Sequence, residues 1–260
     1  MSTSTPGAPS ERNAIAVVVP ARDEAERIGA TVRSALLLPG IRHVVVVDDG
    51  SLDATGRLAA EAGAVVVRHP RSRGKGTAME TGAARVAALD LGSGLPPSAL
   101  LFVDADLGES AAATAPLAGP VLAGDADMTI AVLPPQSTPG GGHGFVVRLA
   151  RAGIRRATGW TSAQPLSGMR CLTREAFDAA RPLAPGWGVE TGLTIDLLTA
   201  GYRLTEVPCD LHHRVTGTDF RGQLHRAGQY RDVARALAAR RLRRAAPLRL
   251  LNVIARTSAR

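Results

Sequence analysis

The sequence is poor in cysteine and aromatic residues, and it contains no apolar run that approaches the length of a membrane span. The two cysteines, Cys171 and Cys209, are too few for a disulfide framework or a zinc site, so we expect reduced core residues. Aromatic residues make up 3% of the chain and do not alternate with basic ones, which argues against stacking on single-stranded nucleic acid. Residues 1–13 contain no hydrophobic stretch and indicate a flexible tail instead of a signal peptide. These absences favour a cytoplasmic globular protein.

Lysine is nearly absent too, and the positive charge is concentrated in arginines at one end of the chain. The formal net charge is +8, but residues 221–260 hold eleven arginines against one acid, Asp232, and so carry +10. The periodicity predicts a helix over 223–244, which either packs on the sheet with its arginines in solvent or makes a peripheral contact with the inner face of an anionic membrane. No nucleic-acid-binding module is recognisable, so we expect no nucleic acid partner. A homodimer is compatible with the sequence.

Short apolar runs alternate with stretches of helical periodicity along the first half of the chain. Each run is rich in Val, Ile, Leu or Ala and ends at turn signals or acidic residues, which is typical of a buried strand. Strands are expected at 14–19, 43–47, 64–67, 99–103 and 127–132, and helices at 24–38, 53–61, 75–91 and 111–122. The alternation predicts an α/β fold with a mostly parallel, doubly wound, Rossmann-like sheet and helices on both faces.

The second half of the chain begins with a polar loop rich in Gly and Pro at 133–144. A connection of this length is typical of a functional lid or of a disordered segment, and we expect a loop on the substrate side. Beyond it, helices are expected at 145–158, from 173 onward and at 190–200, with strands at 168–172 and 203–207.

Acidic residues follow three of the predicted strands. Glu24 comes after the first strand, Asp48 and Asp49 after the second, and Asp104 and Asp106 after the fourth. The carboxyl ends of parallel strands meet at one edge, where open α/β sheets bind their ligands. Side chains at positions i and i+2 of a strand point the same way, so we expect Asp104 and Asp106 to converge on one Mg2+ or Mn2+ ion. In isolation, Asp48 and Asp49 are better explained as turn residues.

Gly74-Lys75-Gly76 opens the helix that follows the third strand. The two glycines let the backbone approach a ligand, and Lys75, the only lysine of the chain, supplies a cation for phosphate. The spacing fits neither a P-loop nor a dinucleotide fingerprint, so we expect a nucleotide–sugar conjugate instead of ATP or NAD. A solvated surface lysine is the alternative.

Four segments in this order, VVVPARDEAERI, VVVVDDGSLDAT, RGKGTAM and LLFVDADL, resemble the GT-A glycosyltransferases of family 2. The segments QPLSGMRCLTREAF and APGWGVETGLTIDLLTAGYRLTEVPCDLHHR are similar to the glucosyl-3-phosphoglycerate synthases and the polyprenyl-phosphate sugar transferases. The resemblance covers residues 14–215. It implies that residues 14–132 bind the nucleotide sugar and that 133–218 complete the metal and acceptor sites of the same GT-A domain, followed by a basic helical tail at 219–260.

The resemblance also implies roles for individual residues. The nucleotide sugar would be bound by Pro20, Ala21, Glu24, Asp49, Gly74, Lys75, Asp104 and Ala105. The Mg2+ or Mn2+ ion would be held by Asp104, Asp106 and His213, whose neutral imidazole is a good ligand for Mn2+. Asp106 and Glu190 would be catalytic, and Glu190 would be the general base of an inverting enzyme or a sugar contact in a retaining one. The alternative for Glu190 is a first-turn acid that only offsets the helix dipole.

The acceptor is the least defined partner. Gly142, Ser167 and Arg214 are candidates for the acceptor side, while Phe145 and Val147 stand where the phosphoglycerate synthases are expected to carry an Arg and a Thr for the acceptor phosphate. We predict a metal-dependent glycosyltransferase that moves a sugar from a UDP- or GDP-sugar to a hydroxyl or phosphate acceptor, such as a polyprenyl phosphate or a small phosphorylated acid. The alternatives are a sugar-phosphate nucleotidyltransferase and a non-catalytic, basic membrane-binding adaptor on the same fold.

Overall fold

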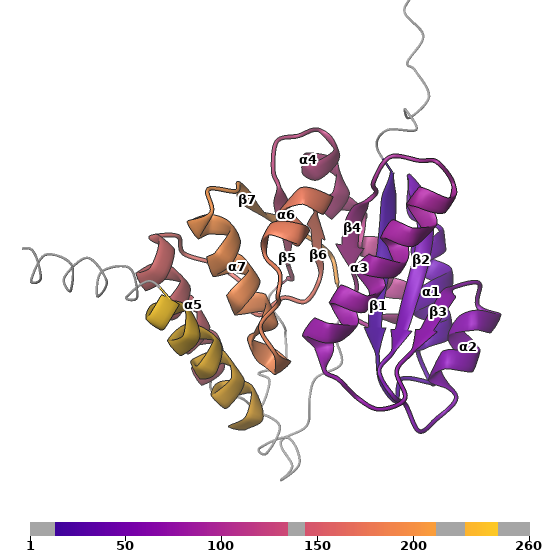
Figure 1. The fold of residues 1–260 in the computed structure, drawn as a ribbon, viewed down its shortest axis with the longest axis horizontal. Helices are drawn as coiled ribbons and strands as arrows, with labels where there is room; N and C mark the ends of the chain where they lie inside the picture. Colours follow the sequence, from indigo (N-terminus) through magenta and orange to yellow (C-terminus); the bar gives the residue numbers. More distant parts are fainter. Residues whose placement is uncertain (1–13, 135–143, 212–226, 244–260) are drawn as a thin grey trace, which may run out of the picture.

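The computed structural model describes residues 14–134, 144–211 and 227–243, which form a seven-stranded sheet between two layers of helices (Figure 1). The strands are β1 (Ile15–Ala21), β2 (Ile41–Asp48), β3 (Val65–Arg68), β4 (Ala99–Phe102), β5 (Met128–Val132), β6 (Arg170–Leu172) and β7 (Leu204–Pro208). Their order in the sheet is β3-β2-β1-β4-β6-β5-β7. Neighbouring strands pair in parallel except at β6, which runs against both β4 and β5. The mostly parallel sheet predicted from the sequence is confirmed.

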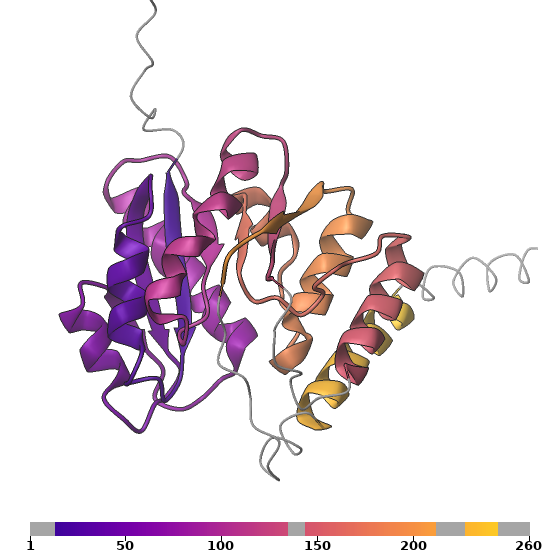
Figure 2. The ribbon, with the colours of Figure 1, turned by 180° about the vertical axis from the view of Figure 1, so that it is seen from behind.

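The central strands are buried on both faces, which explains their nearly continuous apolar runs. Because successive side chains of β1 alternate, Val17 and Val19 belong to one core cluster and Ala16 and Val18 to the other. Helices α1 (Ile28–Leu36), α2 (Thr55–Glu61) and α4 (Ala118–Leu122) and the 3-10 helix η1 (Gly108–Leu117) cover the first face. Helices α3 (Lys75–Gly92), α6 (Arg174–Ala179) and α7 (Val189–Thr199) cover the second. Figures 1 and 2 show these two layers from opposite sides.

The first helix begins at Ile28, a few residues later than predicted. In the segment before it, the N–H of Glu24 donates to Thr55 Oγ1 at 2.8 Å, and that of Ala25 donates to Asp53 Oδ2 at 3.1 Å. These bonds connect the segments that follow β1 and β2, and the Ile28 N–H donates to the Glu24 carbonyl at 2.9 Å.

The helix predicted at 111–122 is also different. The chain there forms the 3-10 helix η1 and then the short helix α4. Pro116 lies inside η1 and Pro120 lies inside α4, and a proline cannot donate the backbone hydrogen bond that a continuous α-helix needs.

The helix at residues 227–243 lies beside α5 (Phe145–Thr158), which packs on α7 at one end of the molecule (Figures 1 and 2). Glycines permit the close approach: a Cβ on Gly153 would lie 2.6 Å from Leu237 Cδ1, and one on Gly188 would lie 2.7 Å from Ala236 Cβ. The helix therefore packs on α5 and on the start of α7, not on the sheet as predicted. The predicted tail at 1–13 and residues 219–226 and 244–260 lie outside the described residues. None of the helices in the described segments combines the length and the apolar character that crossing a bilayer requires.

Candidate active site

Acidic side chains gather at the edge of the sheet where β1, β2 and β4 end. Strand β4 ends at Phe102, and Asp104 and Asp106 belong to the turn beyond it. We predicted that Asp104 and Asp106 converge because side chains at positions i and i+2 of a strand point the same way. That reason is wrong, because both residues lie beyond the end of β4. Contacts from α1 set the position of this turn instead.

Helix α1 fixes the turn through its first residues and the residue before it. Thr31 Oγ1 donates to the carbonyl of Ala105 at 2.8 Å and accepts from the N–H of Gly108 at 2.8 Å. Arg27 Nη1 donates to the carbonyl of Asp106 at 3.2 Å. Sequence reasoning missed Thr31 and Arg27, because both read as ordinary helix residues until the tertiary contacts are seen.

Lys75 lies between two carboxylates from opposite halves of the chain. Its Nζ is 2.8 Å from Asp104 Oδ1 and 2.9 Å from Glu190 Oε1. Burial acts to lower the pKa of Lys75, but the two carboxylates outweigh it and raise that pKa, so the ammonium stays protonated at neutral pH. The structure thus brings together three predicted site residues, and the surface-lysine alternative for Lys75 is excluded by its ion pairs. Glu190 is 5% exposed in the first turn of α7.

Asp49 organises the loop that leads into α3. Its carboxylate is buried and accepts hydrogen bonds from Ser72 Oγ at 2.7 Å, from the Arg73 N–H at 2.8 Å and from the Gly74 N–H at 2.9 Å. His69 Nδ1 lies 2.7 Å from the same group. Burial acts to raise the pKa of Asp49, but these hydrogen bonds outweigh it and lower that pKa. The carboxylate thus holds the loop that presents the helix start; its predicted contact with a base stays a prediction.

Strand β6 brings two further residues to the site because it runs against β4. Arg170, the first residue of β6, pairs with Phe102, the last residue of β4, so the segment before β6 lies beside the Asp104 turn. A Cβ on Gly168 would lie 2.5 Å from Asp104 Oδ1 and 2.6 Å from Lys75 Nζ. Only glycine leaves room for this ion pair at position 168. Sequence reasoning quoted Gly168 within a motif but assigned it no role.

Arg170 is 1% exposed and ties the start of α7 to the segment before β6. Its Nε donates to the Ser167 carbonyl at 2.8 Å, and its Nη1 donates to the Glu190 carbonyl at 3.1 Å and to Thr194 Oγ1 at 2.8 Å. Its Nη2 donates to the Pro165 carbonyl at 3.2 Å. Burial lowers the pKa of Arg170 to about 10, and the charge of Glu190 acts in the opposite direction, so the guanidinium is still charged at pH 7. An arginine inside an otherwise apolar strand was the signal available in the sequence, and it was missed.

A polar pocket of about 280 Å3 opens beside the Asp104–Asp106 turn. Its lining consists of Asp23, Glu24, Ala25, Glu26, Arg27, Asp53 and Asp106. Five carboxylates and one guanidinium make this lining acidic, so it suits hydroxyl and N–H donors, such as those of a ribose and a base, or a cation. It does not suit a bare diphosphate. The predicted nucleotide residue Glu24 and the predicted metal ligand Asp106 are therefore placed in one cavity.

The side chains of the Asp104–Asp106 turn supply only part of the ligand set that a hard divalent cation needs. Asp104 and Asp106 offer carboxylate oxygens, which Mg2+ and Mn2+ prefer, and Lys75 offsets only one of the negative charges around them. No cluster of three or more His, Cys, Asp or Glu with metal-binding geometry occurs within residues 14–134, 144–211 and 227–243. The third predicted ligand, His213, lies outside the described residues.

The remaining predicted residues are divided between the site and the undescribed segments. Pro20 and Ala21 form the last two residues of β1, and the Ala21 carbonyl accepts from the Asp49 N–H at 2.8 Å. Ser167 is buried, and its hydroxyl has no hydrogen-bond partner among the residues that the structure describes. Gly142 and Arg214, the other acceptor-side candidates, lie outside those residues.

An open α/β sheet with carboxylates, one lysine and a polar pocket at its carboxyl edge defines a class of proteins that bind a nucleotide at that edge. Residues 16–178, which are more than half of the chain, match glycosyl transferase family 2, and the chain therefore belongs to this family. The fold is the GT-A-like fold of that family.

Known proteins agree with this assignment. The chain is 32% identical to glycosyltransferase AglJ of Haloferax volcanii over 80% of its length, and 34% identical to the glucosyl-3-phosphoglycerate synthase of Mycolicibacterium paratuberculosis over 70%. It spans 66% and 59% of the lengths of these two curated relatives. The crystal structure of the Mycobacterium tuberculosis glucosyl-3-phosphoglycerate synthase with Mn2+, UDP and glucosyl-3-phosphoglycerate superposes with a TM-score of 0.68 at 26% identity, covering 92% of this chain and 86% of that one.

Proposed function

We propose that the protein is a metal-dependent glycosyltransferase that moves a sugar from a nucleoside-diphosphate sugar, with UDP as the nucleotide, to an acceptor that bears a phosphate. The observation that carries the proposal is the contact of Lys75 with both Asp104 and Glu190, because it joins the predicted nucleotide half and acceptor half in one charged cluster. A mycobacterial relative binds UDP, Mn2+ and a glucosylated phosphoglycerate, which supports the same ligand classes here.

Each residue of the cluster has a separate task in this proposal. Asp104 and Asp106, with His213, hold Mg2+ or Mn2+, which when bound neutralises charge on the departing diphosphate as a Lewis acid. Lys75, protonated at neutral pH, adds a fixed positive charge at the start of α3. Glu190, held by Lys75 and through its backbone by Arg170, faces the sugar or the acceptor hydroxyl.

The role of Glu190 depends on whether the reaction inverts or retains the anomeric configuration. As a general base it would deprotonate the acceptor hydroxyl and the anomeric configuration would invert; as a sugar contact it would accompany retention. The anomeric proton coupling of the product, measured by NMR, separates these courses.

The resemblance implies that the acceptor side differs from that of the phosphoglycerate synthases at the start of α5, where Phe145 stands in place of an Arg. Phe145 is 61% exposed, and the guanidinium carbon of Arg148 lies 4.4 Å from the centre of its ring. In this proposal Arg148 supplies the missing cation one helical turn further on. We assign it to the acceptor phosphate, and Arg148→Gln is expected to raise KM for the acceptor with little change in donor binding.

The decisive experiment is a thermal-shift panel of UDP, GDP, dTDP and CDP, each with and without Mn2+, on the wild type and on Asp106→Ala. A nucleotide at a hundredfold excess over its Kd stabilises the fold by about 2.7 kcal/mol. The expected result is a shift with UDP that requires Mn2+ and is absent in Asp106→Ala. The matched control Asp125→Ala removes an exposed carboxylate after α4 and should keep the full shift.

Absence of any nucleotide-dependent shift in the wild type would contradict the proposal and favour a non-catalytic adaptor. The family match already favours sugar transfer over a nucleotidyltransferase. A shift with UTP and a sugar phosphate but not with UDP would reverse that preference.

A further inference from the structure

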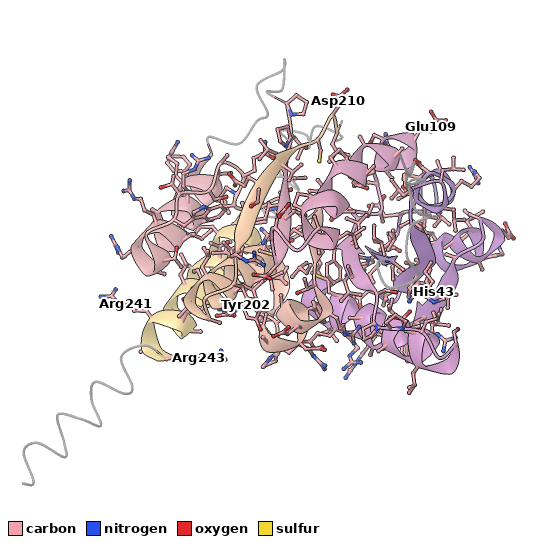
Figure 3. All side chains as sticks on the ribbon, turned by 90° about the horizontal axis from the view of Figure 1, so that it is seen from above. His43, Glu109, Tyr202, Asp210, Arg241 and Arg243 are labelled. Carbon is pink, nitrogen blue, oxygen red and sulfur yellow. The ribbon has the colours of Figure 1, made fainter. Side chains whose placement is uncertain are left out.

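Helix α5 and the helix at residues 227–243 together form a strongly basic end of the molecule. The two helices contain nine arginines and one acid, Asp232. Seven of these arginines are exposed. Six of them, all except Arg148 at the start of α5, are called the basic face here: Arg155, Arg156, Arg231, Arg235, Arg241 and Arg243. Figures 1 and 2 show the helices side by side, and in Figure 3 the labelled side chains of Arg241 and Arg243 point away from the rest of the molecule.

The fold uses other residues of these helices for its own packing. Arg240 is buried and donates from Nε to Asp196 of α7 at 2.9 Å, and Arg151 donates from Nε to the Ser162 carbonyl at 2.7 Å. Val233 is fully buried on the inner side. The arginines of the basic face are therefore those that these packing contacts leave exposed to solvent.

Most of the positive charge on the basic face is not paired with an acid among the residues that the structure describes. Asp232 accepts from the Trp187 N–H at 3.3 Å and pairs with Arg231 at 3.3 Å. Within the described residues, the other five arginines of the basic face take part in no ion pair. Arginines in the last turn of a helix are explained by the helix dipole, but Arg235 lies in the middle of its helix and has no such explanation.

Large apolar side chains are exposed among these arginines. Tyr230 is 48% exposed and Leu242 is 66% exposed on the same helix. Guanidinium groups pair with phosphate in a two-pronged geometry, and tyrosine and leucine side chains enter the boundary between headgroups and acyl chains. An anionic bilayer satisfies both chemistries, whereas a nucleic acid offers no place for Leu242.

We propose that the basic face docks the protein on the surface of an anionic lipid bilayer. The docking is peripheral, because the apolar sides of both helices pack on the protein, and it depends on charge with a smaller apolar contribution from Tyr230 and Leu242. It is independent of the transfer reaction proposed above.

The test is co-sedimentation of the full chain with vesicles of phosphatidylcholine alone and with vesicles in which about a third of the lipid is phosphatidylglycerol. Each arginine at an anionic surface strengthens binding about fivefold, so the triple variant Arg156→Gln/Arg235→Gln/Arg241→Gln should bind the anionic vesicles about a hundredfold more weakly. The matched control replaces three exposed arginines of α1, α2 and α3, Arg33, Arg57 and Arg85, by glutamine. It has the same net charge as the first variant and should bind like the wild type.

Three outcomes would overturn the proposal: no preference of the wild type for anionic vesicles, an equal loss in both triple variants, or tighter binding to a duplex oligonucleotide than to the vesicles. The UDP and Mn2+ thermal shift, measured on the same preparations, checks that each variant is folded. It also separates the two proposals, because a wild type that shows the nucleotide shift but no preference for anionic vesicles contradicts the docking alone.

Discussion

Replacing Gly168 by alanine tests how closely β6 fits the candidate active site. The added Cβ would lie 2.5 Å from Asp104 Oδ1 and 2.6 Å from Lys75 Nζ, whereas ordinary contacts of a Cβ begin near 3.4 Å. The carboxylate and the ammonium must therefore retreat by about 0.9 Å. Both are ends of flexible side chains, so the backbone can stay in place while the charged groups move.

The expected result is a loss of ligand binding with little loss of stability. Displacing a metal ligand or its supporting group costs about 10- to 100-fold in metal affinity. Mn2+-dependent binding of UDP, measured by titration calorimetry, should weaken by that factor in Gly168→Ala, while the free energy of unfolding in urea changes by less than about 1 kcal/mol. The control is Gly92→Ala at the exposed end of α3, where a Cβ meets nothing within 4 Å. It should bind UDP normally and gain up to about 1 kcal/mol of stability.

Wild-type UDP binding by Gly168→Ala would refute the reasoning, since the Asp104–Lys75 pair would then lie outside the metal and nucleotide site. A binding loss that only parallels a loss of stability would refute it too, because the backbone would have moved and not the charged side chains.

Three further predictions concern residues around the same cluster. Lys75→Met removes the cation between Asp104 and Glu190, so calorimetry should show Mn2+ alone binding more tightly, by about tenfold, and UDP with Mn2+ binding more weakly. Arg170→Met removes four buried hydrogen bonds and should lower the free energy of unfolding in urea by about 3 kcal/mol or more. Arg170→Lys should recover only part of this loss, because one ammonium cannot match the planar guanidinium. The folded pKa of Asp49 is lowered, so its stabilisation is fully present above the ordinary carboxyl pKa of 3.8 and is lost as the pH falls through the lower, folded value. The difference in Tm between wild type and Asp49→Asn should therefore be largest near neutral pH and narrow below about pH 4, and a constant difference would contradict the assignment.

The sheet could be predicted because its central strands carry their own signal. Runs such as 15–19 and 44–47 are apolar at every position, which only a strand buried on both faces requires, and helical periodicity separates them. The acids that follow these runs indicated the functional edge of the sheet, because parallel strands bring their carboxyl ends together. Asp104 was predicted to lie at this edge, Lys75 at the start of a neighbouring helix, and Glu190 in the site through the family resemblance; the structure places Lys75 in contact with both carboxylates.

The contacts that hold the site could not be predicted, because they depend on tertiary neighbours. Strand β6 is three residues long, and nothing in its sequence states that it runs against β4. Asp49 read as a turn residue or a base contact, and its role in the loop before α3 follows only from four partners that the fold supplies. Pro116 and Pro120 did signal a broken helix, and that signal in the sequence was not used.

Because β6 runs against β4, two residues at or just before its start have opposite requirements for side-chain size. Position 168 must lack a side chain, because the charged ends of Asp104 and Lys75 occupy the space that its Cβ would need. Position 170, two residues later, must carry a long cationic side chain, because Arg170 donates buried hydrogen bonds to four acceptors of the neighbouring segments. A substitution at the first position should therefore change ligand binding without changing stability, and one at the second should change both. If β6 were only a spacer between β4 and β5, the two positions would respond alike, so the pair of variants measures what the reversed strand contributes to the site.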